Sequence, residues 1–404
     1  MSERKVERST LIDTTPEMAF EAVTRASELR EWMCEYAWTM IQANGVYHAR
    51  WEGGYYTNGR FVELDPPRRA IITWLGPGEP GETVVTFTVE PEANGTRVTI
   101  VHTGFGPGPE WDAAVAASEK GWDRGLDNLK STLETGIDLR IVNRPFMGIL
   151  FDVLNADRAA KEGIAVNEGV YINDTVEGSG ARAAGLVKSD VIVSLDGVAT
   201  PGWHELGPIL GGHQAGDTIE AVVVRGQDRR TIPLTLGRRP VEQAPATIDD
   251  LANRVAELYA ETDTALKAAV VGLTEAEAGR SPAKGEWSVK EVLAHLSITE
   301  RDEQCFGFCI AVDGFVDTGP GDLAALEGRL AAALEVTPSL DGMVSRFLTE
   351  EAETVALIRR LPASAAAHKA RFHRLGQYMV GFPAHTKEHI EQIKATIQAV
   401  RAGQ

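Results

Sequence analysis

Two histidines, His385 and His389, stand four residues apart in the stretch GFPAHTKEHIEQI (residues 381–393). Residues i and i+4 lie on one face of an α-helix, about 6 Å apart, so both imidazoles could bind one ion. A third candidate is His295, which shares a helical stripe with Val292 in the stretch SVKEVLAHLS. Two interpretations remain open. The three histidines form a metal site, or His385 and His389 are polar residues on a solvated face and His295 is a hydrogen-bonded core residue.

Other side chains that could bind the same metal lie too far along the helix. Cys305 and Cys309 follow His295 by ten and fourteen residues, which is about 15 Å and 21 Å at 1.5 Å per residue. These two cysteines are four residues apart and could form a small site of their own, but we expect them to be buried thiols. Pro383 lies two residues before His385. Because proline lacks a backbone N–H, it either kinks the helix or occupies its first turn.

Four helical segments must position the three histidines. Apolar residues recur with a period near 3.6 in the first segment, and the second begins with a capping box formed by Ser288 and Glu291. Pro362 ends the third segment. The connections are mostly short, and the longer second one suits a four-helix bundle with one crossover. The predicted helices span residues 248–273, 286–312, 338–362 and 375–401.

The stretch GEWSVKEVLAHL, followed about ninety residues later by HTKEH, resembles the DinB or YfiT-like superfamily. The resemblance implies a four-helix bundle over residues 248–404, in which His295, His385 and His389 bind nickel or zinc. Three imidazoles leave one or more coordination positions open for a water or a thiolate. Carboxylates often orient such imidazoles, and Glu300, Glu388 and Glu391 lie nearby in the sequence. Characterised relatives add a low-molecular-weight thiol, such as bacillithiol or mycothiol, to an electrophile. The resemblance therefore implies a divalent metal cofactor and a thiol cosubstrate.

The middle segment, residues 140–238, alternates predicted strands with two short helices, and a hairpin turns around Gly226. It resembles the PDZ domains of HtrA-type proteases, and the stretch RPFMGILFD matches their carboxylate-binding loop. The resemblance implies that a protein C-terminus binds this loop and adds a strand to the sheet edge. A structural spacer is the alternative, and strand packing is the alternative role of Met147 and Ile149. The implied carboxylate-binding residues are Arg144, Phe146, Met147, Gly148 and Ile149.

The first segment, residues 1–136, reads as a strand, short helices, a series of strands and a long C-terminal helix. That order predicts a curved antiparallel sheet packed on a helix. The stretches DPPRRAIITW, GTRVTIVHTGF and GWDRGLDNLKSTLE resemble the SRPBCC superfamily, most of all its branch related to activators of the heat-shock ninety ATPase. The resemblance implies a helix-grip fold with a cavity for a small hydrophobic ligand; core packing is the alternative for each tryptophan. The candidate cavity residues are Trp32, Trp51, Trp74 and Trp122, with Trp38 as a further candidate.

The chain has 404 residues and a formal charge of −18. Because a negative surface repels phosphate backbones and anionic lipids, we expect no nucleic-acid or membrane partner. No apolar run is long enough to span a bilayer, and the N-terminal stretch MSERKVERSTLIDTT lacks the apolar core of a signal peptide. Three cysteines do not suggest a disulfide framework. We therefore expect a bacterial protein of the reducing cytoplasm.

The sequence thus predicts a multidomain chain: an α+β helix-grip domain, a small β-rich PDZ domain, a linker at residues 239–247 and an all-α four-helix bundle. One hypothesis is a metal-dependent thiol transferase that acts on a small molecule. Another is a non-enzymatic adaptor or sensor that binds protein C-termini and a hydrophobic ligand. A third, an activator of a chaperone ATPase, rests on fold analogy alone. Metal content with a bound thiol favours the first, and peptide binding without turnover favours the second.

Overall fold

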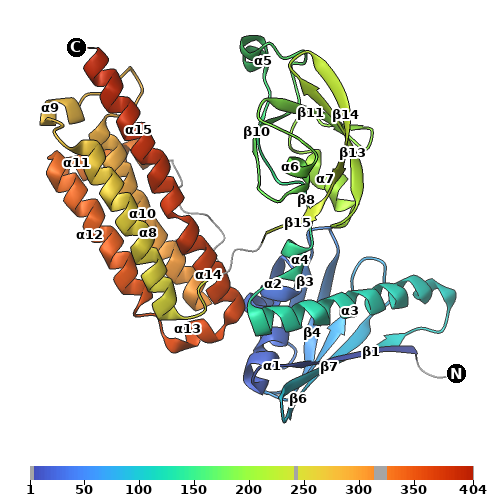
Figure 1. The fold of residues 1–404 in the computed structure, drawn as a ribbon. Coiled ribbons are helices and arrows are strands. Elements are labelled where there is room, and N and C mark those ends of the chain that lie inside the picture. The colour runs from blue at the N-terminus through green and yellow to red at the C-terminus, as the bar shows by residue number, and fades with distance from the viewer. Residues whose placement is uncertain (1–3, 241–243, 314–324, 404) are drawn as a thin grey trace. The chain divides into compact units, whose positions relative to one another are not determined.

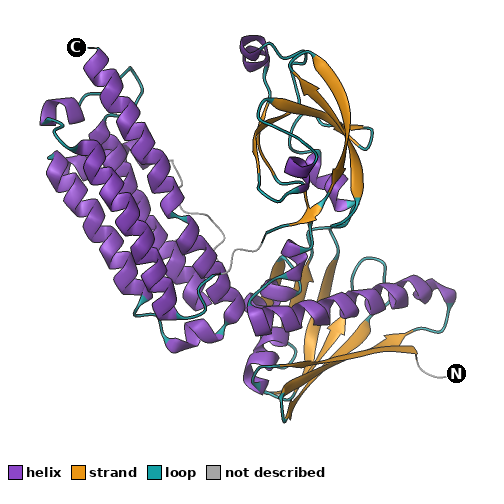
Figure 2. Ribbon diagram, in the orientation of Figure 1, coloured by secondary structure: helices purple, strands orange, loops and turns teal. Residues whose placement is uncertain are grey.

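The computed structural model describes residues 4–240, 244–313 and 325–403. The chain divides into two compact units: one combines Met1–Ile137 with Glu242–Gln404, and the other is Asp138–Val241. The first unit holds an N-terminal α+β domain and a helical bundle, and the second is mostly strands (Figures 1 and 2). Within the described residues, no helix is both long and apolar enough to cross a membrane.

The N-terminal domain is a curved antiparallel sheet with a long helix, α3, across it (Figure 1). Its strand order is β1-β7-β6-β5-β4-β3-β2. The Thr15 hydroxyl caps α1, Pro16 occupies the first turn of that helix, and α3 buries Trp122 and Leu129 against the sheet. This confirms the predicted helix-grip class, although β2 was not predicted. The elements are β1 (Arg4–Ile12), α1 (Pro16–Thr24), α2 (Ala26–Trp32), β2 (Tyr36–Thr39), β3 (Val46–Arg50), β4 (Tyr56–Asp65), β5 (Arg69–Trp74), β6 (Thr83–Glu92), β7 (Gly95–Phe105), η1 (Pro109–Trp111) and α3 (Asp112–Thr135).

The middle unit is built on a six-stranded antiparallel sheet ordered β14-β13-β11-β10-β9, with β12 paired to β11, so β9 is an edge strand. Arg225 on β13 donates two hydrogen bonds, of 2.6 and 2.8 Å, to the fully buried Asp190 carboxylate on β11. A second, two-stranded sheet joins β15 to β8. The elements are α4 (Leu139–Val142), β8 (Pro145–Phe146), β9 (Ile149–Val153), α5 (Ala156–Glu162), β10 (Val170–Thr175), α6 (Gly180–Ala183), β11 (Asp190–Leu195), β12 (Val198–Ala199), α7 (Leu206–Gly211), β13 (Thr218–Arg225), β14 (Asp228–Thr235) and β15 (Gly237–Arg238).

The C-terminal region is a bundle of long helices (Figure 2). Thr247 caps its first helix by accepting a hydrogen bond from the Asp250 N–H. Apolar side chains form two clusters, one around Leu293, Phe347 and Ile393 and the other nearer the α14 end of the bundle. The helices are α8 (Ile248–Val270), α9 (Glu275–Ala278), α10 (Val289–Asp313), α11 (Leu326–Val336), α12 (Leu340–Ile358), α13 (Ala363–Ala367), α14 (Lys369–Gly381) and α15 (Pro383–Ala402).

The predicted fourth helix is two helices in the structure. α14 ends at Gly381, and Pro383 is the first residue of α15. Proline is favoured at this position because the N–H that it lacks would have no partner inside the helix. Of the two alternatives for Pro383, the first-turn position is therefore confirmed. The connection between the second and third predicted helices contains α11, which was not predicted. Residues 314–324 of this connection lie outside the described residues.

The prediction that Cys305 and Cys309 are buried thiols was wrong. Both side chains are exposed, and only Cys34 among the three cysteines is buried. The two thiols are four residues apart and lie on an outward face of α10. The prediction rested on residue type alone, because cysteine is usually buried. On this helix other residues fill the inward face.

Candidate functional site

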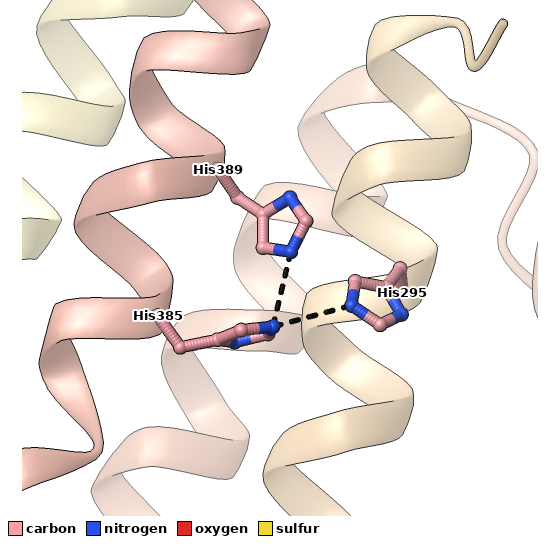
Figure 3. A group of neighbouring side chains, drawn as sticks. All are labelled: His295, His385 and His389. Carbon is pink, nitrogen blue, oxygen red and sulfur yellow. Dashed lines mark hydrogen bonds between the residues drawn. The ribbon is translucent and has the colours of Figure 1, made fainter. Parts of the chain in front are cut away.

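The three candidate metal ligands come from two packed helices of the bundle. α10 begins with the predicted capping box: the Ser288 N–H donates to Glu291 Oε2 at 2.7 Å, and the Glu291 N–H donates to the Ser288 hydroxyl at 3.3 Å. This fixes the start of the helix two turns before His295. His385 and His389 lie in the first turns of α15, and their imidazoles point toward that of His295 (Figure 3).

The Nε2 atoms of the three imidazoles converge. His385 Nε2 lies 3.4 Å from His295 Nε2 and 3.0 Å from His389 Nε2, and the three ligand atoms all lie within 4.8 Å of one another. Metal–nitrogen bonds of about 2.0–2.1 Å in tetrahedral geometry place neighbouring ligand atoms about 3.3–3.4 Å apart. The donor set and its spacing therefore fit a nickel or zinc ion, and Pro383 does not displace His385 from the group.

Burial keeps two of these imidazoles uncharged. Desolvation, together with smaller effects of the neighbouring His389, His385 and Arg329, lowers the pKa of His295 to about 4. Desolvation, with a smaller effect of His389, also lowers the pKa of His385. A neutral imidazole is the form that binds a metal. The protein environment therefore favours the ligating state at neutral pH.

The ring nitrogen opposite the ligand atom has a hydrogen-bond partner in one of the three imidazoles. His389 Nδ1–H donates to Gln392 Oε1 at 2.7 Å, which leaves the Nε2 lone pair directed at the centre of the group. The Nδ1 atoms of His295 and His385 are buried and have no hydrogen-bond partner among the residues that the structure describes. Sequence reasoning considered only glutamates for this orienting role and missed Gln392. Its spacing of three residues from His389 is the signal that could have found it.

The glutamates that the sequence suggested as orienting partners have other contacts. Glu300 accepts hydrogen bonds from Tyr259, at 2.8 Å, and from Thr354. Glu391 pairs with Lys394 at 2.6 Å. Glu388 acts on His385 only through its charge, which opposes the lowering of the pKa of that imidazole.

Two aromatic rings and one cation surround the histidines. The ring of Trp287 lies 5.1 Å from that of His295, and Phe382 stacks on His385 at 5.7 Å. Arg329 on α11 contributes positive charge near His295 and is held by Asp302 through hydrogen bonds of 2.8 and 2.6 Å.

The predicted carboxylate-binding loop lies at the start of edge strand β9. Gly148 has a φ of +81°, and a Cβ there would lie 2.1 Å from Ser179 Cβ, so only glycine fits. Phe146 pairs with Gly237 in the small sheet, and Arg144 is exposed. The side chain of Met147 is 4% exposed and belongs to the domain core, which agrees with the alternative of strand packing. Only the backbone of Met147 could therefore face a ligand.

Strand β9 presents an apolar surface beside that loop. Ile149 packs partly against the core of the domain. Leu150, Phe151 and Val153 are exposed, although each is a large apolar side chain. Because an edge strand also has unpaired backbone groups, this arrangement suits an added peptide strand.

The candidate cavity tryptophans lie in the N-terminal core, except for Trp38. Trp32, Trp74 and Trp122 are buried, whereas Trp38 is 58% exposed on β2 and does not face the interior. The rings of Trp51 and Trp122 lie 6.1 and 5.4 Å from that of Trp74. A lining role for Trp32, Trp51, Trp74 and Trp122 stays a prediction.

His102 joins this aromatic group through a satisfied hydrogen-bond chain. The Trp122 indole N–H donates to His102 Nδ1 at 3.2 Å, His102 Nε2 contacts the Thr83 hydroxyl at 2.7 Å, and that hydroxyl donates to the Trp74 carbonyl at 2.9 Å. Desolvation lowers the pKa of His102 to about 4. This neutral, fully bonded imidazole has a structural role.

Comparisons with known proteins give the same three domains in the same order. Residues 13–134 match the family described as activator of Hsp90 ATPase homolog 1-like protein, residues 145–236 match the PDZ domain, and residues 257–393 match the DinB superfamily. The metal-ligand candidates His295, His385 and His389 all lie inside the third match.

Curated relatives cover only part of this chain. A probable periplasmic serine endoprotease, DegP-like, from Pseudomonas fulva is 25% identical over 151 residues, which is 37% of this chain and 31% of that protein. One from Marinomonas sp. is 31% identical over 99 residues, 24% of this chain and 21% of that protein. The chain therefore spans less than a third of the length of these relatives.

Two solved structures resemble part of the chain. A Mesorhizobium loti protein is 22% identical, with a TM-score of 0.30, and the match covers 32% of this chain and 96% of that one. The Aha1 dimer from Colwellia psychrerythraea is 21% identical, with a TM-score of 0.29, and the match covers the same shares.

Proposed function

We propose that this chain, in which domains matching the activator of Hsp90 ATPase homolog 1-like, PDZ and DinB families follow one another, is a metal-dependent thiol transferase. The DinB-like bundle would bind one nickel or zinc ion through His295, His385 and His389. The observation that carries the proposal is the convergence of their three Nε2 atoms.

The residues of the bundle prepare the site for this chemistry. A bound divalent ion supplies Lewis acidity, which lowers the pKa of a thiol that occupies its open position. Burial holds His295 and His385 neutral, and Gln392 fixes the ring of His389. In the overall reaction, the sulfur forms a bond to the electrophilic carbon, the thiol proton passes to solvent, and the leaving group departs with its electron pair.

A transfer assay tests this proposal. Purified chain reconstituted with nickel or zinc is mixed with cysteine or glutathione as the thiol and with 1-chloro-2,4-dinitrobenzene as the electrophile. We expect metal-dependent thioether formation that His389→Ala abolishes and that His204→Ala, which removes an exposed histidine outside the bundle, leaves intact. Metal-loaded protein that gives no turnover with either thiol, or turnover that survives His389→Ala, contradicts the proposal.

A second candidate function is that of an adaptor that captures protein C-termini. It is favoured by the glycine conformation at Gly148 and by the exposed apolar side chains of the neighbouring edge strand. The N-terminal domain would then bind a small hydrophobic ligand, as its fold suggests. A peptide with a free C-terminus should bind in preference to the same peptide with an amidated C-terminus. Equal binding of the two would rule out carboxylate recognition.

We also propose that this chain works in the cytoplasm. Cys305 and Cys309 are exposed, free thiols, which would persist in a reducing cytoplasm. The DegP-like relatives are described as periplasmic. Fractionation of cells that express the chain distinguishes the two compartments, and recovery with periplasmic markers would contradict the proposal.

A further inference from the structure

A groove next to the histidines is not used by the proposed metal site. It has a volume of about 600 Å³ and lies between the turn before α10 and the outer face of α15. Its walls include Gly285, Glu286, Trp287, Gln392, Ala395 and Ala399. Since ligand sites of small molecules typically occupy about 300–1,000 Å³, the groove is large enough for a small organic molecule.

Two wall residues also touch the histidines. Trp287 lies 5.1 Å, ring to ring, from His295, and Gln392 accepts the hydrogen bond of His389 at 2.7 Å. The groove therefore begins where the histidine group ends and follows α15 toward its C-terminus. A molecule lying in it would have one end beside Trp287 and Gln392, the two wall residues that contact His295 and His389.

The chemistry of the wall selects a kind of ligand. Trp287 offers an indole ring, and the small side chains of Ala395 and Ala399 leave room for a flat ring. Glu286 is the one ionisable side chain among the lining residues, and it is exposed. An indole ring and a carboxylate both attract an organic cation.

We infer that the groove binds the non-reacting part of the small-molecule substrate, and that this part is a flat ring carrying a cationic group. The position of the reacting end rests on the proposed metal function, whereas binding of the cation in the groove does not. The groove fixes the orientation of the substrate, and its carboxylate disfavours anionic substrates of the same shape.

Three probes that share one ring and differ in charge test the inference: benzylamine, benzyl alcohol and phenylacetate. Binding to the metal-reconstituted full chain is followed by NMR titration. We expect a dissociation constant of about a millimolar for benzylamine, which is usual for so few atoms. Phenylacetate should bind at least about fivefold more weakly. Equal or tighter binding of phenylacetate, or no binding of benzylamine, overturns the inference.

Two variants on one helix locate the binding site. Ala395→Leu adds bulk inside the groove, and Gln398→Leu adds an apolar side chain at an exposed position of α15 that does not line it. We expect Ala395→Leu to weaken benzylamine binding more than about fivefold and Gln398→Leu to leave it unchanged. Glu286→Gln should weaken it about two- to fivefold, as loss of an exposed ion pair does. Unchanged binding in Ala395→Leu overturns the inference.

Metal content measured in the same samples separates this inference from the proposed function. His389→Ala should lose the metal and still bind benzylamine, because the groove wall remains. Wild-type protein that binds benzylamine but no metal overturns the metal function and leaves the groove assignment standing. In cobalt-loaded protein, the benzylamine signals should broaden relative to zinc-loaded protein. Equal line widths would show that the bound amine does not lie beside the histidines.

Discussion

Replacing the buried Glu351 with glutamine should stabilise the bundle, and this stabilisation should grow as the pH rises. Glu351 on α12 is 2% exposed, and neither of its oxygens has a hydrogen-bond partner among the described residues when the group is ionised. Its pKa is raised to about 11, mainly by burial and also by a hydrogen bond to Asp263 and the negative charges of Asp263 and Glu300, while Lys267 opposes them. Glu351 is therefore protonated in the folded protein and can donate to Asp263.

The sign and size of the effect follow from this raised pKa. In the unfolded chain, Glu351 ionises near its ordinary pKa of 4.5. Between that value and the folded pKa, the folded state binds one more proton, so stability is greatest at low pH and falls by about 1.4 kcal/mol per pH unit. From pH 6 to pH 8 the loss is on the order of 3 kcal/mol. Glutamine has the same shape, can donate to Asp263, and does not titrate.

Urea unfolding followed by helical circular dichroism at pH 6 and pH 8 measures this effect in wild type and Glu351→Gln. The gain in unfolding free energy should be larger at pH 8 by about 3 kcal/mol. Other raised carboxyls, such as Glu303 with a pKa of about 7, remain in both proteins, so the difference isolates Glu351. Glu353→Gln, at an exposed position of the same helix, is the control. The same difference between wild type and Glu351→Gln at both pH values would refute the reasoning.

Gly148→Ala should weaken binding of a free C-terminal peptide at least about tenfold, because a left-handed backbone costs alanine about 1–2 kcal/mol and its Cβ meets Ser179; unchanged fluorescence anisotropy would contradict this. Arg225→Met should destabilise the PDZ domain by roughly 3 kcal/mol, because it leaves the buried carboxylate of Asp190 without its cation, although the Val187 N–H still donates to it, and an unchanged melting temperature would argue against that pair. Ser288→Ala should lower the stability of the bundle by about 1 kcal/mol through loss of the helix cap, measured by urea unfolding, where no change would contradict the capping role.

Local patterns predicted the positions that depend on local physics. The Ser288 capping box fixed the start of α10, and the spacing of His385 and His389 placed both on one face. These features depend on residues three or four apart along the chain. The order of the three domains could be predicted because each domain has its own motifs within a short stretch of sequence.

Features that depend on packing could not be predicted in this way. The break between α14 and α15 depends on whether the chain around Pro383 can turn, and a helical period does not encode that. The exposure of Cys305 and the orienting role of Gln392 depend on which face of a helix meets its neighbours. The groove beside Trp287 joins residues about a hundred positions apart, so only the fold reveals it.

Metal content by elemental mass spectrometry tests the central claim most directly. The measurement compares wild type with His295→Ala and His389→Ala after reconstitution with nickel or zinc, and His204→Ala controls for the loss of any histidine. The account predicts near one equivalent of metal in wild type and in the control, and loss of metal in both triad variants. Wild-type protein without metal after reconstitution, or triad variants that retain it, would contradict the account.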